Sequence, residues 1–209
     1  MTLSTLELCR SAPMIPVIVV DEVDDAVPLA HALVAGGIKV LEVTLRTPVA
    51  LDAIRAIKAD VPGAIVGSGT VQTPADLAAC VDAGCAFGVS PGSPARLIDA
   101  VRESGLPFLP GVNTPSEAMH LADQGFEVLK FFPASAAGGV PMLKAMAAPL
   151  PNIHFCPTGG VSLDNAKDYL AVPTVVTVGG SWVAPKKLVD AGDWAGIEAL
   201  ARDTSAALG

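Results

Sequence analysis

The sequence predicts an α/β protein: a single (β/α)8 TIM barrel domain over residues 1–209, with an extra N-terminal helix. Three observations lead to this prediction. Eight short apolar runs, rich in β-branched residues, recur at intervals of 21 to 26 residues. The segments between them have helical spacing and are long enough for the crossover helices that parallel strands require. Eight such units in 209 residues favour a closed barrel with short loops over an open sheet.

The expected strands cover 15–20, 40–44, 64–67, 86–89, 107–110, 128–132, 154–157 and 175–179. Several of them are followed by clusters of Gly, Thr or Ser, so polar residues gather at the carboxyl ends of the strands. Active sites lie at this end both in barrels and in open parallel sheets. Segments 2–9 and 192–206 are expected to form helices outside the repeat.

The expected helices begin and end at recognisable signals. The helix that starts near Val23 ends at Gly36-Gly37. Four others begin at pairs in which a hydroxyl caps free N–H groups and a proline takes the first helical position. These pairs are Thr47-Pro48, Thr73-Pro74, Ser93-Pro94 and Thr114-Pro115. Thr114 and Glu117 also have the spacing of a capping box.

Composition and charge restrict the possible classes of protein. Hydrophobic residues make up 51% of the chain and the mean hydropathy is +0.53, as expected for strands buried on both faces. Proline and glycine interrupt every long apolar stretch, so no membrane-spanning helix is expected. A net charge of −8 argues against nucleic-acid binding. The chain lacks signal-peptide and C-x-x-C patterns, so we expect a cytoplasmic protein with reduced thiols and no metal.

Lys130 lies in an apolar run, 128–133, at the sixth expected strand. Apolar neighbours deprive an ammonium group of hydration and so favour the neutral amine. A neutral lysine is a nucleophile that forms imines with ketones. The alternative is a lysine that extends from the strand end to solvent or to a salt bridge, and the local sequence leaves both interpretations open.

Glu42 and Arg46 end the second expected strand, where alternation places both on one face with Thr44. A buried Glu42 near a cation suits proton transfer, and Arg46 can bind a carboxylate through two parallel hydrogen bonds. An internal Glu–Arg salt bridge is the alternative. Thr70 closes the turn Gly67-Ser68-Gly69-Thr70, where its hydroxyl can bond a carboxylate or can simply belong to a strand-to-helix turn.

Two double-glycine turns predict a phosphate site. Thr158-Gly159-Gly160 follows the seventh expected strand, and Gly179-Gly180-Ser181 follows the eighth. In barrels, the loops after these two strands often present N–H groups to a phosphate. Tight turns without a ligand are the alternative. We expect structural or exposed positions for the three histidines, and core packing for Phe132 and Trp182.

Four segments taken together resemble the KDPG (2-keto-3-deoxy-6-phosphogluconate) aldolase family, which also includes 4-hydroxy-2-oxoglutarate aldolases. They are LEVTLRT at 41–47, KFFP at 130–133, CPTGGV at 156–161 and GGSW at 179–182. They occur in order at the expected strand ends, and the resemblance runs from about residue 10 to the end of the chain. Any one of these motifs alone is weak, whereas their joint presence is specific.

The resemblance implies a class I aldolase that cleaves KDPG to pyruvate and glyceraldehyde 3-phosphate in the Entner–Doudoroff pathway, as a homotrimer without a cofactor. It implies that Lys130 forms the Schiff base and that Glu42 is the general acid and base. It places Arg46 and Thr70 at the pyruvate carboxylate. It places the phosphate at Gly159, Gly160, Gly180 and Ser181.

The chain departs from the family pattern at two positions, and three alternatives remain. Ser68 stands where relatives often have alanine, and Ser135 replaces an expected acidic residue, so either can tune substrate preference. The alternatives are an aldolase for 2-keto-3-deoxy-6-phosphogalactonate or 4-hydroxy-2-oxoglutarate, an isomerase of phosphorylated ribose intermediates, and a non-catalytic sugar-phosphate-binding barrel.

Overall fold

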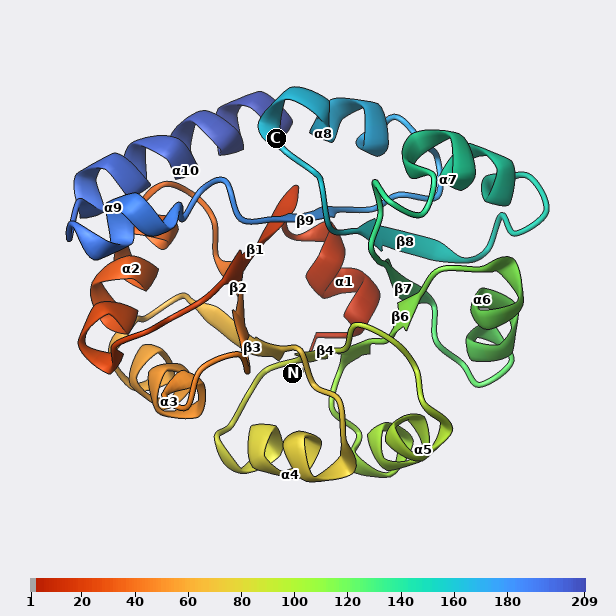
Figure 1. Cartoon of the computed structure of the whole chain (residues 1–209), viewed down its shortest axis with the longest axis horizontal. Coiled ribbons are helices and arrows are strands. Elements are labelled where there is room, and N and C mark those ends of the chain that lie inside the picture. Colours follow the sequence, from red (N-terminus) through yellow and green to blue (C-terminus); the bar gives the residue numbers. More distant parts are fainter. Residues whose placement is uncertain (1–2) are drawn as a thin grey trace.

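The computed structural model describes residues 3–209 and contains short parallel strands surrounded by helices (Figure 1). The strands form a six-stranded sheet of order β5-β4-β3-β2-β1-β9 and a three-stranded sheet of order β6-β7-β8. Their bounds are β1 Met14–Ile18, β2 Val40–Thr44, β3 Ile65–Gly69, β4 Gly88–Val89, β5 Phe108–Leu109, β6 Gly111–Val112, β7 Val128–Phe131, β8 His154–Pro157 and β9 Val178–Gly180. The predicted α/β fold with parallel strands is confirmed.

The helices lie around the outside of the strands in Figure 1, and α1 is seen through the space that the strands surround. Their bounds are α1 Thr5–Arg10, α2 Val23–Ala35, α3 Ala50–Asp60, α4 Pro74–Asp82, α5 Ala95–Ser104, α6 Pro115–Ala122, α7 Gly139–Ala147, α8 Leu163–Leu170, α9 Lys186–Asp190 and α10 Trp194–Leu208. The helix expected over 2–9 corresponds to α1, and residue 2 lies outside the described residues. Within residues 3–209, no helix has the length and apolar character needed to cross a membrane.

Contacts between the two sheets occur at both of their edges. The isolated parallel bridges Phe155–Val175 and Thr158–Gly179 connect β8 with the segment that contains β9. At the other edge, only Pro110 separates β5 from β6. The strand expected at 107–110 corresponds to β5, which ends before Pro110 because proline has no N–H group for the ladder, and β6 lies beyond the expected range.

The hydroxyl–proline pairs fulfil the predicted capping role at two helices and fail at two others. Thr73 and Thr114 cap α4 and α6 with capping boxes, and each is followed by proline. The prediction is wrong for Thr47, because α3 begins only at Ala50 and the Thr47 hydroxyl donates to the Val20 carbonyl at 2.6 Å. It is also wrong for Ser93, because α5 begins at Ala95 and has no side-chain cap.

Buried apolar side chains form two clusters on opposite sides of the strands. The outer cluster fills the layer between strands and helices. The inner cluster joins Leu8 and Cys9 of α1 to Val40 and Val128, which are the first residues of β2 and β7. Helix α1 therefore packs against the amino ends of the strands and leaves their carboxyl ends free for a site.

Candidate active site

Lys130 and Glu42 meet in the space that the strands surround, although 88 residues separate them in sequence. Lys130 is the third residue of β7 and Glu42 the third residue of β2. The Lys130 Nζ atom lies 3.2 Å from the Glu42 Oε1 atom, and the two residues are 5% and 3% exposed. Two opposite charges buried side by side offset part of each other's desolvation cost. Removing one of the two side chains would therefore leave an unpaired buried charge, which destabilises the fold.

Gly69, the last residue of β3, provides the space that the Glu42 carboxylate occupies. A Cβ atom at this position would lie 2.7 Å from Glu42 Cγ and 2.8 Å from Cδ, and it would overlap Oε1. Gly69 pairs with Thr44, two residues beyond Glu42 on β2. A side chain at position 69 is therefore incompatible with the observed position of the carboxylate.

Cys156 and Phe132 complete the surroundings of the lysine. Cys156 is the registered partner of Lys130 on the neighbouring strand β8. Burial raises the pKa of the Cys156 thiol to about 12, with a smaller raising effect of Glu42 and a lowering effect of Lys130. The thiol is thus a neutral neighbour of the ion pair. The Phe132 ring centroid lies 5.5 Å from Lys130 Nζ, within the range of a cation–π contact.

Arg46 and Thr70 lie together beyond the ends of β2 and β3. The Arg46 Nε group donates a hydrogen bond to Thr70 Oγ1 at 3.3 Å, and the guanidinium is otherwise exposed. Thr70 has a φ of 62°, and no other non-glycine residue among 3–209 has a positive φ. A left-handed conformation costs a β-branched residue roughly 1–3 kcal/mol, and such strain clusters at functional sites.

The two double-glycine turns lie side by side, as their positions in the repeat predict. Thr158 bridges to Gly179, and a Cβ atom on Gly179 would overlap the Thr158 side chain. Gly159 and Gly160 have φ values of 97° and 76°, which glycine adopts without strain. Within residues 3–209, the N–H groups of Gly159, Gly160 and Ser181 donate no hydrogen bond, so they remain available to an anion.

Comparison with known proteins assigns this arrangement to a family. The family model for KDPG and KHG aldolase matches residues 6–200. The chain belongs to this family. The KHG/KDPG aldolase of Escherichia coli strain K12 is 50% identical over 200 residues, which cover 96% of this chain and 94% of that protein. The chain is thus an aldolase, a carbon–carbon lyase.

Two solved structures of aldolases resemble this aldolase over nearly the whole chain. The KDPG aldolase of Legionella pneumophila, with pyruvate captured as a covalent carbinolamine intermediate, has a TM-score of 0.95 and 44% identity, and covers 98% of this chain and 99% of its own. The KDPG aldolase of Zymomonas mobilis ZM4 with 3-phosphoglycerate has a TM-score of 0.92 and 46% identity, and covers 99% and 97%.

The two positions at which this aldolase departs from the family pattern lie in different surroundings. The Ser68 side chain is fully buried and lies against Cys80 and Cys85. Ser135 is exposed, and its N–H donates to the Gly159 carbonyl at 2.9 Å. Of the two serines, Ser135 is the one at the double-glycine turns.

Three contributors to the candidate site do not follow from the local sequence. Phe132 was assigned to core packing but is partly exposed beside Lys130. Gly69 leaves room for the Glu42 carboxylate, and Cys156 is an uncharged neighbour of Lys130. Both roles depend on which strands lie next to each other, and the local sequence gives no signal for this. Trp182 packs as expected, and its Nε1 group donates to Thr204 of α10 at 3.0 Å.

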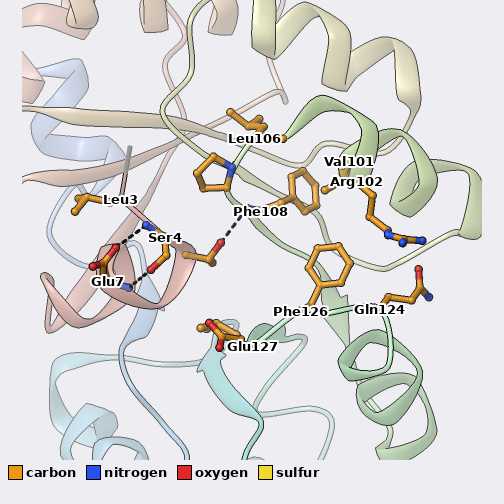
Figure 2. Close-up of a pocket in the computed structure, with 15 residues that line it drawn as sticks. Leu3, Ser4, Glu7, Val101, Arg102, Leu106, Phe108, Gln124, Phe126 and Glu127 are labelled. Atoms are coloured by element: carbon orange, nitrogen blue, oxygen red, sulfur yellow. Dashed lines mark hydrogen bonds between the residues drawn. The ribbon is translucent and has the colours of Figure 1, made fainter. Parts of the chain in front are cut away.

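One cavity of the aldolase lies away from the lysine. It has a volume of about 540 Å³ and is bordered by α1, Leu106, Phe108, Phe126 and Glu127 (Figure 2). These residues lie at the amino ends of β5 and β7, whereas the site faces the opposite end. Among residues 3–209, no group of three or more His, Cys, Asp or Glu side chains is placed to hold a metal ion.

Proposed function

We propose that this aldolase cleaves 2-keto-3-deoxy-6-phosphogluconate to pyruvate and glyceraldehyde 3-phosphate through a Schiff base on Lys130. The reaction places it in the Entner–Doudoroff pathway. The observation that carries the proposal is the buried contact of 3.2 Å between Lys130 Nζ and Glu42 Oε1. It puts the amine that attacks a ketone next to the carboxylate that moves its protons.

The proposed scaffold is one domain, residues 1–209, that forms a closed (β/α)8 barrel with α1 across its amino end. The bridges between β8 and β9 and the continuity of β5 with β6 support closure. The inner cluster supports it as well, because it combines side chains from strands on all sides. We also propose that the barrel assembles as a homotrimer in the cytoplasm, which the family resemblance suggests. Light scattering of the purified protein measures the assembly directly.

The first half of the proposed reaction makes the imine. Lys130 passes a proton to Glu42, the neutral amine adds to the C2 ketone, and Glu42 returns the proton with which the carbinolamine loses water. The resulting protonated imine is an electron sink. Arg46 and Thr70 hold the substrate carboxylate, Arg46 through paired charge-assisted hydrogen bonds. This hold fixes C2 next to the lysine, and such positioning replaces a bimolecular encounter by an intramolecular one.

The second half breaks the C3–C4 bond. Glu42 removes the proton of the C4 hydroxyl, the C4 carbonyl forms, and the electron pair of the C3–C4 bond moves to the imine as an enamine. The aldehyde phosphate leaves. Glu42 then gives the proton that it took from the C4 hydroxyl to C3 of the enamine. Water adds to C2 of the imine, and this step releases pyruvate and restores the Lys130–Glu42 pair.

The phosphate of the substrate is proposed to bind at the two double-glycine turns. The free N–H groups of Gly159, Gly160 and Ser181 supply hydrogen-bond donors, and the buried strand end at Gly180 holds Ser181 beside them. Backbone N–H groups in such turns bind anions without a dedicated cation. This proposal explains how a chain with a net charge of −8 accepts a phosphorylated acid.

The proposed function is tested by pyruvate release in an assay coupled to lactate dehydrogenase. We expect cleavage of 2-keto-3-deoxy-6-phosphogluconate in preference to its C4 epimer, 2-keto-3-deoxy-6-phosphogalactonate. Cleavage of 4-hydroxy-2-oxoglutarate is a second expected activity, because the E. coli relative is named for both substrates. Lys130→Ala should abolish all of these activities. Ligand binding without pyruvate release by the wild type would instead support the non-catalytic alternative.

A further inference from the structure

Cys80 and Cys85 occupy the two ends of a Schellman motif that closes α4. The Cys85 N–H donates to the Cys80 carbonyl at 3.0 Å, and the Gly84 N–H donates to the Val81 carbonyl at 3.0 Å. Gly84 has the left-handed φ of 75° that this motif requires. The side chains of the two outer residues commonly contact each other in this motif. The fold therefore brings two thiols together at the end of α4.

The same motif closes α9, where its outer residues are Leu188 and Asp193, and it closes α2 and α6, where its outer residues are apolar. At α2 the Ile38 N–H donates to the Leu33 carbonyl at 2.9 Å. At α6 the Phe126 N–H donates to the Leu121 carbonyl at 3.2 Å. Leucine with isoleucine or phenylalanine satisfies the packing at these positions. The cysteine pair at α4 thus adds thiol chemistry that the motif itself does not need.

The environment of the pair distinguishes its two thiols. Cys80 is fully buried and Cys85 is 7% exposed. The neighbouring Cys85 thiol lowers the pKa of Cys80, and Ser68 contributes in the same direction against burial. The Cys80 thiol and burial both raise the pKa of Cys85. Ser68 is fully buried, and its Oγ atom has no hydrogen-bond partner at ordinary distance.

We propose that Cys80 and Cys85 are a peroxide-reactive pair that forms a reversible intrachain disulfide. The Cys80 thiolate attacks one oxygen of hydrogen peroxide, the O–O bond breaks, and hydroxide leaves and takes up a proton as water. The resulting Cys80 sulfenic acid is then attacked by the Cys85 sulfur. The S–O bond breaks, the disulfide forms, and the Cys85 proton leaves with the hydroxyl as a second water. Two thiols are thereby oxidised and one peroxide is reduced to two waters.

The geometry favours this outcome over further oxidation of a single thiol. The 3.0 Å bond between Cys85 N and the Cys80 carbonyl oxygen keeps the two backbones close, as a disulfide requires. The resolving thiol is therefore next to the sulfenic acid as soon as it forms. Burial of both side chains disfavours reaction with a bulky disulfide reagent, because thiol reactions depend on access.

The other two cysteines provide a control within the same chain. Burial raises the pKa of Cys9 well above its ordinary value, and it raises the pKa of Cys156 to about 12. Neither thiol is favoured as a thiolate near neutral pH. Both should stay reduced under conditions that oxidise the pair at α4.

The test is peroxide treatment of the native protein, followed by unfolding, alkylation of free thiols and tryptic mass spectrometry. The tryptic peptide 59–96 contains Cys80 and Cys85 and no other cysteine. We expect this peptide to lose both alkyl labels and two hydrogens, and to regain both labels after dithiothreitol. Cys9 and Cys156 should remain fully alkylated. Full labelling of peptide 59–96, or sulfinic acid at one cysteine without a disulfide, would overturn the proposal.

Two single variants test the direction of the reaction. In Cys85→Ser, the Cys80 sulfenic acid has no resolving thiol and should be trapped by dimedone. In Cys80→Ser, dimedone should label the remaining Cys85 thiol less than it labels Cys80 in Cys85→Ser, because burial still raises the pKa of Cys85. Equal dimedone labelling of both variants would refute the assignment of Cys80 as the attacking thiol. The circular dichroism spectra of both variants verify that they are folded.

Discussion

Replacing Gly69 by alanine should remove most of the activity, although no proposed reacting residue is itself replaced. The added Cβ atom would lie 2.7 Å from Glu42 Cγ, whereas ordinary contacts begin at 3.4 Å. The difference means that the carboxylate must move by at least about 0.7 Å, and Oε1, which lies closer still, must move further. A displacement of ~1 Å at a reacting group costs about 100-fold in rate, or ~2.7 kcal/mol of transition-state stabilisation.

Steady-state cleavage of 2-keto-3-deoxy-6-phosphogluconate measures this effect, and we expect kcat/KM to fall about 100-fold. Gly92→Ala is the matched control, because a Cβ atom there meets no atom within 4 Å. Its activity should stay near that of the wild type. Thermal denaturation of both variants separates a displaced carboxylate from a loss of fold.

A double-variant cycle identifies the route of the effect. If Gly69→Ala acts through Glu42, it should cost little more when it is added to Glu42→Ala, since coupled residues are not additive. A folded Gly69→Ala variant with wild-type activity would refute the reasoning. An equal loss of activity in the Glu42→Ala background would refute it as well.

Three further predictions concern the phosphate turn, a buried thiol and a helix cap. In Gly160→Ala, the added Cβ atom would overlap Ser135, and residue 160 has a φ of 76°. This variant should raise KM for the phosphorylated substrate about tenfold or more and leave the kinetics of 4-hydroxy-2-oxoglutarate cleavage unchanged. Equal effects on both substrates would exclude phosphate binding at Gly160. Because the pKa of Cys156 is raised from 9.0 to about 12 by folding, its stabilising contribution is complete below pH 9 and is lost as pH rises. Urea unfolding measured between pH 9 and about pH 12 should therefore show that the free energy of unfolding falls less steeply with pH in Cys156→Ala than in the wild type. Parallel curves for the two proteins would contradict the assignment. Thr114→Ala removes the acceptor of the Glu117 N–H and should cost about 1 kcal/mol in urea unfolding, whereas the exposed control Ser116→Ala should cost less than about 0.5 kcal/mol.

The repeat of apolar runs was sufficient to predict the parallel α/β fold, because buried strands and crossover helices leave periodic patterns in a sequence. Local chemistry was less reliable. Thr47 and Thr73 both precede a proline, yet only Thr73 caps its helix. The Thr47 hydroxyl donates instead to the carbonyl of Val20, two residues beyond the end of β1. Tertiary partners of this kind have no local signal.

The sequence predicts a site residue correctly when the residue's position along its strand determines that the side chain points into the interior. Glu42 and Lys130 each lie on a strand at a point where an inward side chain reaches the same interior, and the structure brings them together. Ser68 shows the limit of this reasoning. Its neighbours are Cys80 in α4 and Cys85 just after that helix, and no local signal in the sequence gives this tertiary contact. The space at Gly69 required knowledge of which strand lies beside it.

The central claim is that the buried Lys130 amine forms a covalent imine with a 2-keto acid. Pyruvate and borohydride added together should reduce this imine and leave a stable adduct on Lys130. Trypsin does not cleave after the modified lysine, so the adduct should appear on a single peptide spanning 103–144. Lys130→Met, incubated in parallel, should remain unmodified. Recovery of the unmodified peptides 103–130 and 131–144 from a catalytically active wild-type protein would contradict the account.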